Sequence, residues 1–205
     1  MLTQQRTEST SEIPVALIRE TIDGQPFYYP NFRKVLAGEL TLDDIMGSST
    51  LQSFIIDFIL YFVHTNYDRK QYISLSSEIG LHLDKRTNLA SDLAIFERST
   101  LPASKINLSY ADVPPKVVVE VDTNIDYSVE GAFDYVHLKT QKLLDFGVQR
   151  VVWIFTKSRK VMVAVPEQDW LTRDWNQDVE LLDAKFFNIA GYLESEGVGQ
   201  EELDA

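Results

Sequence analysis

The sequence predicts an α/β fold with a mixed central sheet flanked by helices, and three segments carry this prediction. Residues 117–122 are a β-branched run typical of a buried strand, residues 131–146 have the apolar spacing of a helix, and residues 151–155 form a second buried strand. A strand, a crossover helix and a second strand make a βαβ-like unit. Hairpin strands expected on both sides of this unit make the sheet mixed.

The segments before this unit alternate between strand and helix patterns. The Asp23-Gly24 pair indicates a turn, and the apolar period changes from helical spacing to two at Tyr72. In chain order we expect a strand or short helix at 14–20, an edge strand at 26–30, a short helix with a capping box at 41–44, a buried helix at 51–65, a strand pair or one long bent strand at 72–83, and a strand at 91–96.

The segments after the crossover helix complete the sheet. Gly147 ends the helix as a C′ glycine does. A polar turn at 157–160 leads into a hairpin partner at 161–165, and residues 186–193 have the pattern of a last short helix. We expect one domain over 13–195, a disordered polar segment over 1–12 and an acidic tail over 196–205.

Composition excludes several classes of site. The chain of 205 residues has no cysteine, and its three histidines are scattered, so thiolate nucleophiles, disulfides and histidine-rich metal centres are disfavoured. The longest apolar run, residues 54–63, is interrupted by Asp57 and too short to cross a bilayer. We find no signal-peptide pattern and expect a cytoplasmic protein without a membrane partner.

The net charge of −12 bears on any nucleic-acid partner. Proteins that hold nucleic acid tightly usually carry a basic surface. DNA binding by this chain therefore needs a local basic patch or bridging divalent cations.

Two acids stand at the end of the central strand, and a lysine follows on the next helix. Glu120 and Asp122 alternate onto the same strand face, where burial disfavours an unpaired carboxylate. On a helical wheel, Lys139 falls at the edge of the apolar stripe of residues 131–146. If this helix packs on that face of the sheet, Lys139 and Glu120 meet.

Asp92, on the preceding strand, completes a set with Glu120 and Lys139 that suits phosphodiester hydrolysis. Two close carboxylates repel each other, and a hard cation such as Mg²⁺ relieves that repulsion with oxygen ligands. Such an ion polarises a phosphate and lowers the pKa of a bound water. A nearby lysine orients the water or stabilises charge on phosphorus.

These residues resemble the Uma-type restriction endonuclease family. The resemblance covers roughly residues 50 to 165 and rests on Ser-Asp92-Leu-Ala-Ile-Phe, Pro-Pro-Lys-Val-Val-Val-Glu120-Val-Asp, and Lys139 followed by Gly147-Val-Gln-Arg-Val-Val-Trp-Ile. It implies a restriction-endonuclease-like PD-(D/E)XK fold and Mg²⁺- or Mn²⁺-dependent cleavage of DNA. Asp92 and Glu120 match the metal ligands, and Lys139 the catalytic lysine. We also expect a homodimer.

The sequence departs from the wider pattern at two positions. Asp122 stands where the superfamily has lysine, two residues after the glutamate, and the matching lysine is Lys139 on the helix. Ser91 stands where the family pattern prefers proline. Glu78 corresponds to an upstream acid on the neighbouring strand.

Simpler interpretations remain open. Asp92 can cap a strand or turn, Glu120 and Lys139 can form a structural ion pair, and Asp122 can begin a loop. The alternative function is a catalytically silent nuclease-fold protein that serves in binding or assembly. A metal-dependent phosphatase or nucleotide hydrolase is a third class, disfavoured because the chain has no nucleotide-binding glycine motif.

Overall fold

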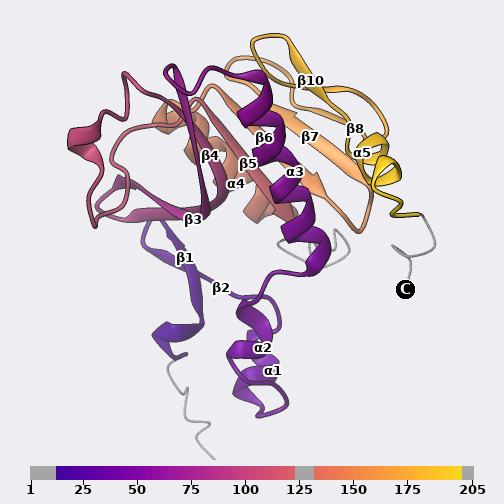
Figure 1. Ribbon diagram of the computed structural model, residues 1–205. Helices are drawn as coiled ribbons and strands as arrows, with labels where there is room; N and C mark the ends of the chain where they lie inside the picture. The colour runs from indigo at the N-terminus through magenta and orange to yellow at the C-terminus, as the bar shows by residue number, and fades with distance from the viewer. Residues whose placement is uncertain (1–12, 123–131, 200–205) are drawn as a thin grey trace, which may run out of the picture.

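The computed structural model describes residues 13–122 and 132–199, and within these ranges a mixed eight-stranded sheet forms the centre of the molecule (Figure 1). The strand order is β2-β1-β4-β5-β6-β7-β8, with β3 paired to β4, and β9 and β10 form a separate two-stranded sheet. The strands are β1 (Ile18–Ile22), β2 (Gln25–Tyr28), β3 (Tyr72–Asp84), β4 (Thr87–Glu97), β5 (Val117–Asp122), β6 (Arg150–Phe155), β7 (Lys160–Ala164), β8 (Leu171–Asp174), β9 (Val179–Leu182) and β10 (Lys185–Phe187). The helices are α1 (Phe32–Leu36), α2 (Asp43–Met46), α3 (Thr50–Asn66), α4 (Ala132–Phe146) and α5 (Ile189–Ser195), with 3-10 turns at Val15–Leu17 and Ala103–Lys105.

The βαβ unit lies where the sequence predicts it. β5 and β6 pair in parallel, from Val117 opposite Arg150 to Asp122 opposite Phe155, and α4 makes the crossover. The other described strand pairs are antiparallel. The prediction of an α/β fold with a mixed central sheet is therefore confirmed.

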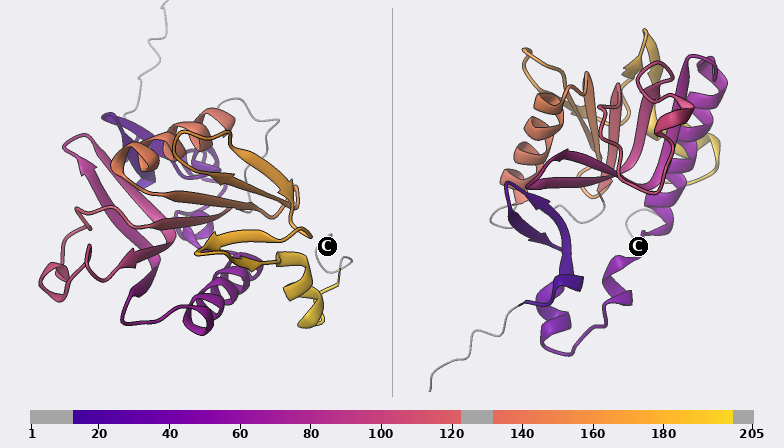
Figure 2. Two further views of the ribbon diagram at one scale, coloured as in Figure 1. Left: turned by 90° about the horizontal axis from the view of Figure 1, so that it is seen from above. Right: turned by 90° about the vertical axis from the view of Figure 1, so that its left-hand side faces the viewer.

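Two apolar layers cover the two faces of the sheet, and successive side chains of β5 point alternately into one layer and the other. Val117, Val119 and Val121 face the layer that includes α3 and α5, whereas Val118 faces the layer beneath α4. Figure 2 shows α3 and α4 on opposite sides of the sheet. Glu120 shares its strand face with Val118, so its carboxylate points toward α4.

Helix α3 begins at Thr50, where the side chain of Ser49 accepts a hydrogen bond from the Gln52 amide. By length and mean hydropathy (1.3), the stretch Asp43–Asn66 could cross a membrane. Extended backbone at Gly47 and Ser49 divides this stretch into α2 and α3. Helix α3 packs Ile55, Phe58, Ile59 and Val63 against the sheet, while only 17% of the apolar window is buried. Cytoplasmic localisation stays a prediction.

The N-terminal strands form the predicted hairpin, and β2 is its edge strand. The turn residues Asp23 and Gly24 have positive φ angles of 52° and 80°, as a tight hairpin turn requires. On the other side, β1 pairs with β4. The hairpin thus brings residues near the N-terminus against the central strands.

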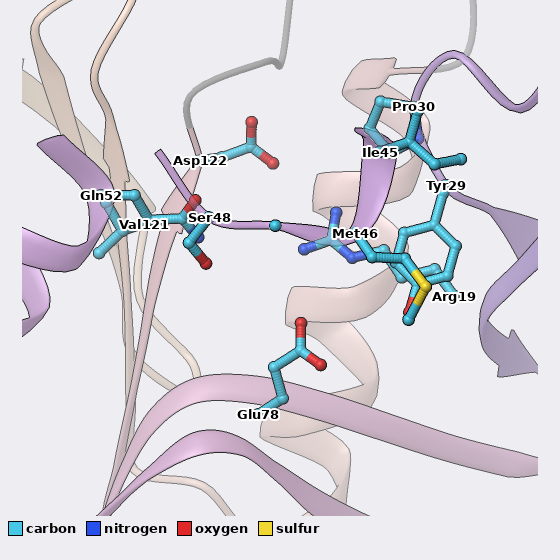
Figure 3. Close-up of a pocket in the computed structure, with 11 residues that line it drawn as sticks. Arg19, Tyr29, Pro30, Ile45, Met46, Ser48, Gln52, Glu78, Val121 and Asp122 are labelled. Atoms are coloured by element: carbon cyan, nitrogen blue, oxygen red, sulfur yellow. The ribbon is translucent and has the colours of Figure 1, made fainter. Parts of the chain in front are cut away.

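Strand β3 is one long bent strand, which decides between the two interpretations of residues 72–83. Its pairing with β4 shifts between Ser76 and Ile79, where Ser77 and Glu78 adopt positive φ angles of 67° and 54°. This irregularity turns Glu78 toward the end of the sheet where Asp122 lies (Figure 3).

The prediction of a helix over 186–193 is wrong at its beginning. Lys185–Phe187 is strand β10, and α5 begins at Ile189. Phe186 is exposed while Phe187 is buried, which is the alternation of a strand. The Asn188 side chain accepts a hydrogen bond from the Gly191 amide and so marks the true start of the helix.

The predicted disordered segment 1–12 and most of the predicted acidic tail lie outside the described residues. The division into one domain with two terminal segments stays a prediction.

Candidate active site

Lys139 lies at the centre of a charged cluster between α4 and the sheet. Its side chain has no exposed surface, and its Nζ atom lies 2.7 Å from Glu20 Oε1, 2.7 Å from the Ala90 carbonyl oxygen and 3.1 Å from Glu120 Oε2. The contact with Glu120 is an ion pair, and the three N–H donors of the ammonium group go to Glu20, the Ala90 carbonyl oxygen and, at 3.5 Å, the Tyr135 hydroxyl. Burial lowers the pKa of Lys139, but Glu120 and Glu20 raise it by more, so the lysine stays charged.

Glu20 reaches Lys139 from β1 and is the member of the cluster that the sequence analysis missed. Its Oε1 atom also accepts a hydrogen bond from the Ala90 amide (3.1 Å), and its Oε2 atom accepts one from the Tyr135 hydroxyl (2.8 Å). Burial raises the pKa of Glu20, but Lys139 and Arg19 lower it by more, so the group is ionised. The signal for it exists, because Glu20 stands two residues before Ile22 on a strand and shares its buried face.

Glu120 has one oxygen in an ion pair and one without a partner. Oε2 contacts Lys139, whereas Oε1 is buried and has no hydrogen-bond partner in the described structure. Burial raises the pKa of Glu120 to about 8; Lys139 opposes this shift, and Asp92 and Glu20 add to it. A buried, unpaired carboxylate oxygen is costly, and binding a cation is one way to offset that cost.

Asp92 joins β4 to β5. Its Oδ2 atom accepts a 2.7 Å hydrogen bond from the Val121 amide, and its Oδ1 atom accepts a long one, 3.4 Å, from Gln52 Nε2 of α3. Burial raises the pKa of Asp92 above its usual range. The carboxylate therefore has a structural partner on one oxygen and a weakly held second oxygen.

Asp92 and Glu120 line the same small cavity, with a volume of about 10 Å³. That is about the space that one water or one ion needs. The other lining residues are Arg19, Tyr29, Glu78, Ala90 and Ser91. A second, more open pocket of about 60 Å³ shares Arg19, Tyr29 and Glu78 with it and is also lined by Asp122 (Figure 3).

Comparisons with known proteins agree with this fold. No family model matches the chain, and no curated protein matches it. Its structure is similar to a crystal structure from Anabaena variabilis described as a "putative nuclease belonging to DUF820", with a TM-score of 0.56, 17% identity and 80% of each chain covered. The chain shares the mixed α/β fold of that protein. The Uma-type and PD-(D/E)XK assignments stay predictions.

A Mg²⁺ ion at this cavity would have Asp92 and Glu120 as its side-chain ligands. Among residues 13–122 and 132–199, no three side chains of the Asp, Glu, His and Cys types lie close enough to hold an ion together. Mg²⁺ is often bound by one or two carboxylates, with waters and substrate phosphates filling the other positions. Glu120 Oε1 and Asp92 Oδ1 suit that kind of site, because neither has a strong competing partner.

Asp122 and Glu78, the other two acids considered from the sequence, line the open pocket. Asp122 is 9% exposed, and its backbone carbonyl accepts a 3.1 Å hydrogen bond from the Thr156 amide where β5 ends. Glu78 is exposed and lines both cavities from the bend of β3. Both face the space beside the Asp92–Glu120 cavity and are further from Lys139 than Glu20 is.

Proposed function

We propose that the protein is a metal-dependent endonuclease that uses Mg²⁺ or Mn²⁺ to hydrolyse phosphodiester bonds of DNA. The observation that carries this proposal is the unpaired, buried Oε1 atom of Glu120 beside Asp92, at a cavity the size of one ion. The fold supports it, since the structural neighbour is described as a "putative nuclease". A relationship to the Uma-type family with its PD-(D/E)XK fold is part of the proposal.

In this proposal Asp92 and Glu120 hold the ion. When bound, the ion polarises a phosphate and lowers the pKa of a water. Lys139 is buried behind Glu120 and lines neither pocket, so its ion pair fixes the orientation of the Glu120 carboxylate and its positive charge acts on the site through that carboxylate. Glu20 and Tyr135 hold Lys139 in that position.

The test is cleavage of a labelled DNA duplex by the purified protein in Mg²⁺ or Mn²⁺. We expect Glu120→Gln to reduce the cleavage rate at least about 100-fold. Glutamine has nearly the same shape as glutamate but lacks the negative charge with which the carboxylate binds the metal. Exposed Glu167→Gln is the matched control and should cut at the wild-type rate. Cleavage that survives both Asp92→Asn and Glu120→Gln would refute the proposal.

The alternative is a catalytically silent nuclease-fold protein that binds or assembles with a partner, for instance as a homodimer. It is favoured by the saturation of Lys139, whose three donors are all occupied, and by the net charge of −12. In that case Mg²⁺ leaves the melting temperature unchanged. A Mg²⁺-dependent rise in the wild type that Glu120→Gln abolishes would exclude this alternative.

A further inference from the structure

Arg19 is a cation at the candidate site that neither the resemblance nor the charged cluster explains. It precedes Glu20 on β1, but its side chain points elsewhere. Glu20 turns toward Lys139, whereas Arg19 lines both the small cavity and the open pocket. The cation is therefore placed on the solvent side of the two carboxylates.

A β-bulge explains why Arg19 and Glu20, although adjacent on β1, both reach the side of the sheet that carries Glu120. In the hairpin, Ile18 pairs with Tyr28 and Glu20 pairs with Phe27, so Arg19 is an extra residue on β1. A bulge of this kind redirects one side chain without ending the strand. Figure 3 shows the Arg19 guanidinium pointing into the pocket, toward the side lined by Ser48 and Asp122.

The Arg19 guanidinium keeps its donors available. Within the described residues it donates no hydrogen bond and makes no ion pair, although Glu20, Glu120 and Asp122 act on it electrostatically. A guanidinium has five N–H donors in a fork that matches a phosphate. A half-buried arginine with unused donors beside a cation site is arranged to receive an anion.

We propose that Arg19 binds a phosphate group of the nucleic-acid substrate in the open pocket, next to the cavity of Asp92 and Glu120. This inference rests on the proposed nuclease function and extends it to a phosphate site. The Ser48 hydroxyl and the Gln52 amide on the opposite wall are further donors. The positive charge of Arg19 locally offsets the repulsion between a protein of net charge −12 and a polyanion.

The phosphate is bound together with a divalent cation, because Glu78 and Asp122 line the same pocket. Two acids beside Arg19 repel an anion unless a cation offsets them. Binding is therefore measured in Ca²⁺, a hard cation with oxygen ligands, on a duplex shown by gel to remain uncut.

The salt dependence of duplex binding tests the proposal. Each phosphate contact contributes about −0.9 to the slope of log K against log salt, so Arg19→Met should flatten that slope by about 0.9. Between 50 and 200 mM salt, the wild type should then lose about 3.5-fold more affinity than Arg19→Met. Arg19→Lys should keep the slope but bind more weakly, because the charge remains while the fork is lost.

Arg33→Met is the matched control, since it removes an exposed arginine from α1 in the same N-terminal region and should leave the slope unchanged. A melting curve for each variant checks folding. A slope in Arg19→Met equal to that of the wild type would overturn the inference and would mean that Arg19 only balances the charge of its acidic neighbours.

Failure of the nuclease proposal gives a different result. If the wild type neither binds nor cuts the duplex, the substrate assignment fails, and inorganic phosphate with Ca²⁺ becomes the probe. Phosphate that raises the melting temperature of the wild type, but not of Arg19→Met, supports a phosphate site at Arg19. Phosphate that leaves the wild type unchanged overturns it.

Discussion

The carboxyl group of Glu120 lies inside the protein, 3.1 Å from Lys139 and at the cavity that Asp92 also lines. Its ordinary pKa is 4.5, and burial raises this pKa to about 8 in the folded protein. The folded state therefore holds the Glu120 proton more tightly than the unfolded state does. The stability that this group contributes is fully present below pH 4.5 and is lost as the pH rises to about 8.

We expect Glu120→Gln to become more stable relative to the wild type as the pH rises from 5 to 8, since glutamine resembles the protonated acid and does not ionise. The difference in unfolding free energy should grow by on the order of 4 kcal/mol across that range and stay constant above it. Urea denaturation in EDTA at several pH values measures it.

Glu167→Gln, at an exposed position, should follow the wild-type pH profile. Parallel profiles for Glu120→Gln and the wild type would show that Glu120 is already ionised at pH 5.

At the residue scale, the sequence indicated those members of the cluster whose chemistry conflicts with their surroundings. Glu120 is an acid in a buried strand, and Lys139 is a cation near an apolar helix stripe. Glu20 carries the same signal, but the segment 14–20 was open to interpretation as strand or helix, so no face could be assigned. The sequence does not indicate which way the Arg19 side chain points, because that depends on a β-bulge that only the pairing of β1 with β2 reveals.

Among the elements, the crossover helix positions the site, and its C-terminal end is a Schellman motif. Gly147 has a φ angle of 113°, its amide donates to the Leu144 carbonyl, and the Val148 amide donates to the Leu143 carbonyl. A Cβ atom at Gly147 would lie 3.2 Å from Pro114 Cγ. The glycine thus meets both a backbone requirement and a steric one.

Gly147→Ala should lower the unfolding free energy by roughly 1–3 kcal/mol, because alanine disfavours this backbone conformation and approaches Pro114 closely. Gly197 ends α5 with the same bond pattern, its φ angle is 78°, and nothing lies within 4 Å of its Cβ position. Gly197→Ala should therefore cost less. Urea midpoints compare the two variants, and equal costs would contradict the role of Pro114.

The long elements were predicted from sequence and the shortest ones were not. Residues 51–65 and 117–122 have enough apolar positions to reveal a period, and both are close to the observed α3 and β5. Strand β10 has three residues, which is too short to show alternation, and its pairing with β9 supplies its structure. Tertiary contacts decide such segments.

For the whole molecule, the net charge of −12 opposes compaction as well as DNA binding. Repulsion among like charges on the surface destabilises the compact state, and salt screens it. The buried ion pairs of Lys139 are screened much less. Salt should therefore act mainly on the surface.

Raising NaCl from 20 to 500 mM should stabilise the wild type by on the order of 1 kcal/mol, or about 2–4 °C in melting temperature, through this screening. Thermal denaturation in EDTA measures the effect. The same series is the control for the Mg²⁺ experiment, which must exceed the shift at equal ionic strength. A melting temperature that falls with NaCl would show that surface ion pairs outweigh the repulsion.

The pairing of Glu20 with Lys139 has a consequence for the order in which the site forms during translation. The two residues are 119 positions apart, and a ribosome adds about 5 to 20 residues per second, so about 6 to 24 s separate their synthesis. Asp92 and Glu120 are added during that interval, and the cation that pairs with Glu20 and Glu120 is synthesised after all three acids. The charged cluster therefore cannot form until Lys139 has been synthesised, and a chain that ends before Lys139 never forms it.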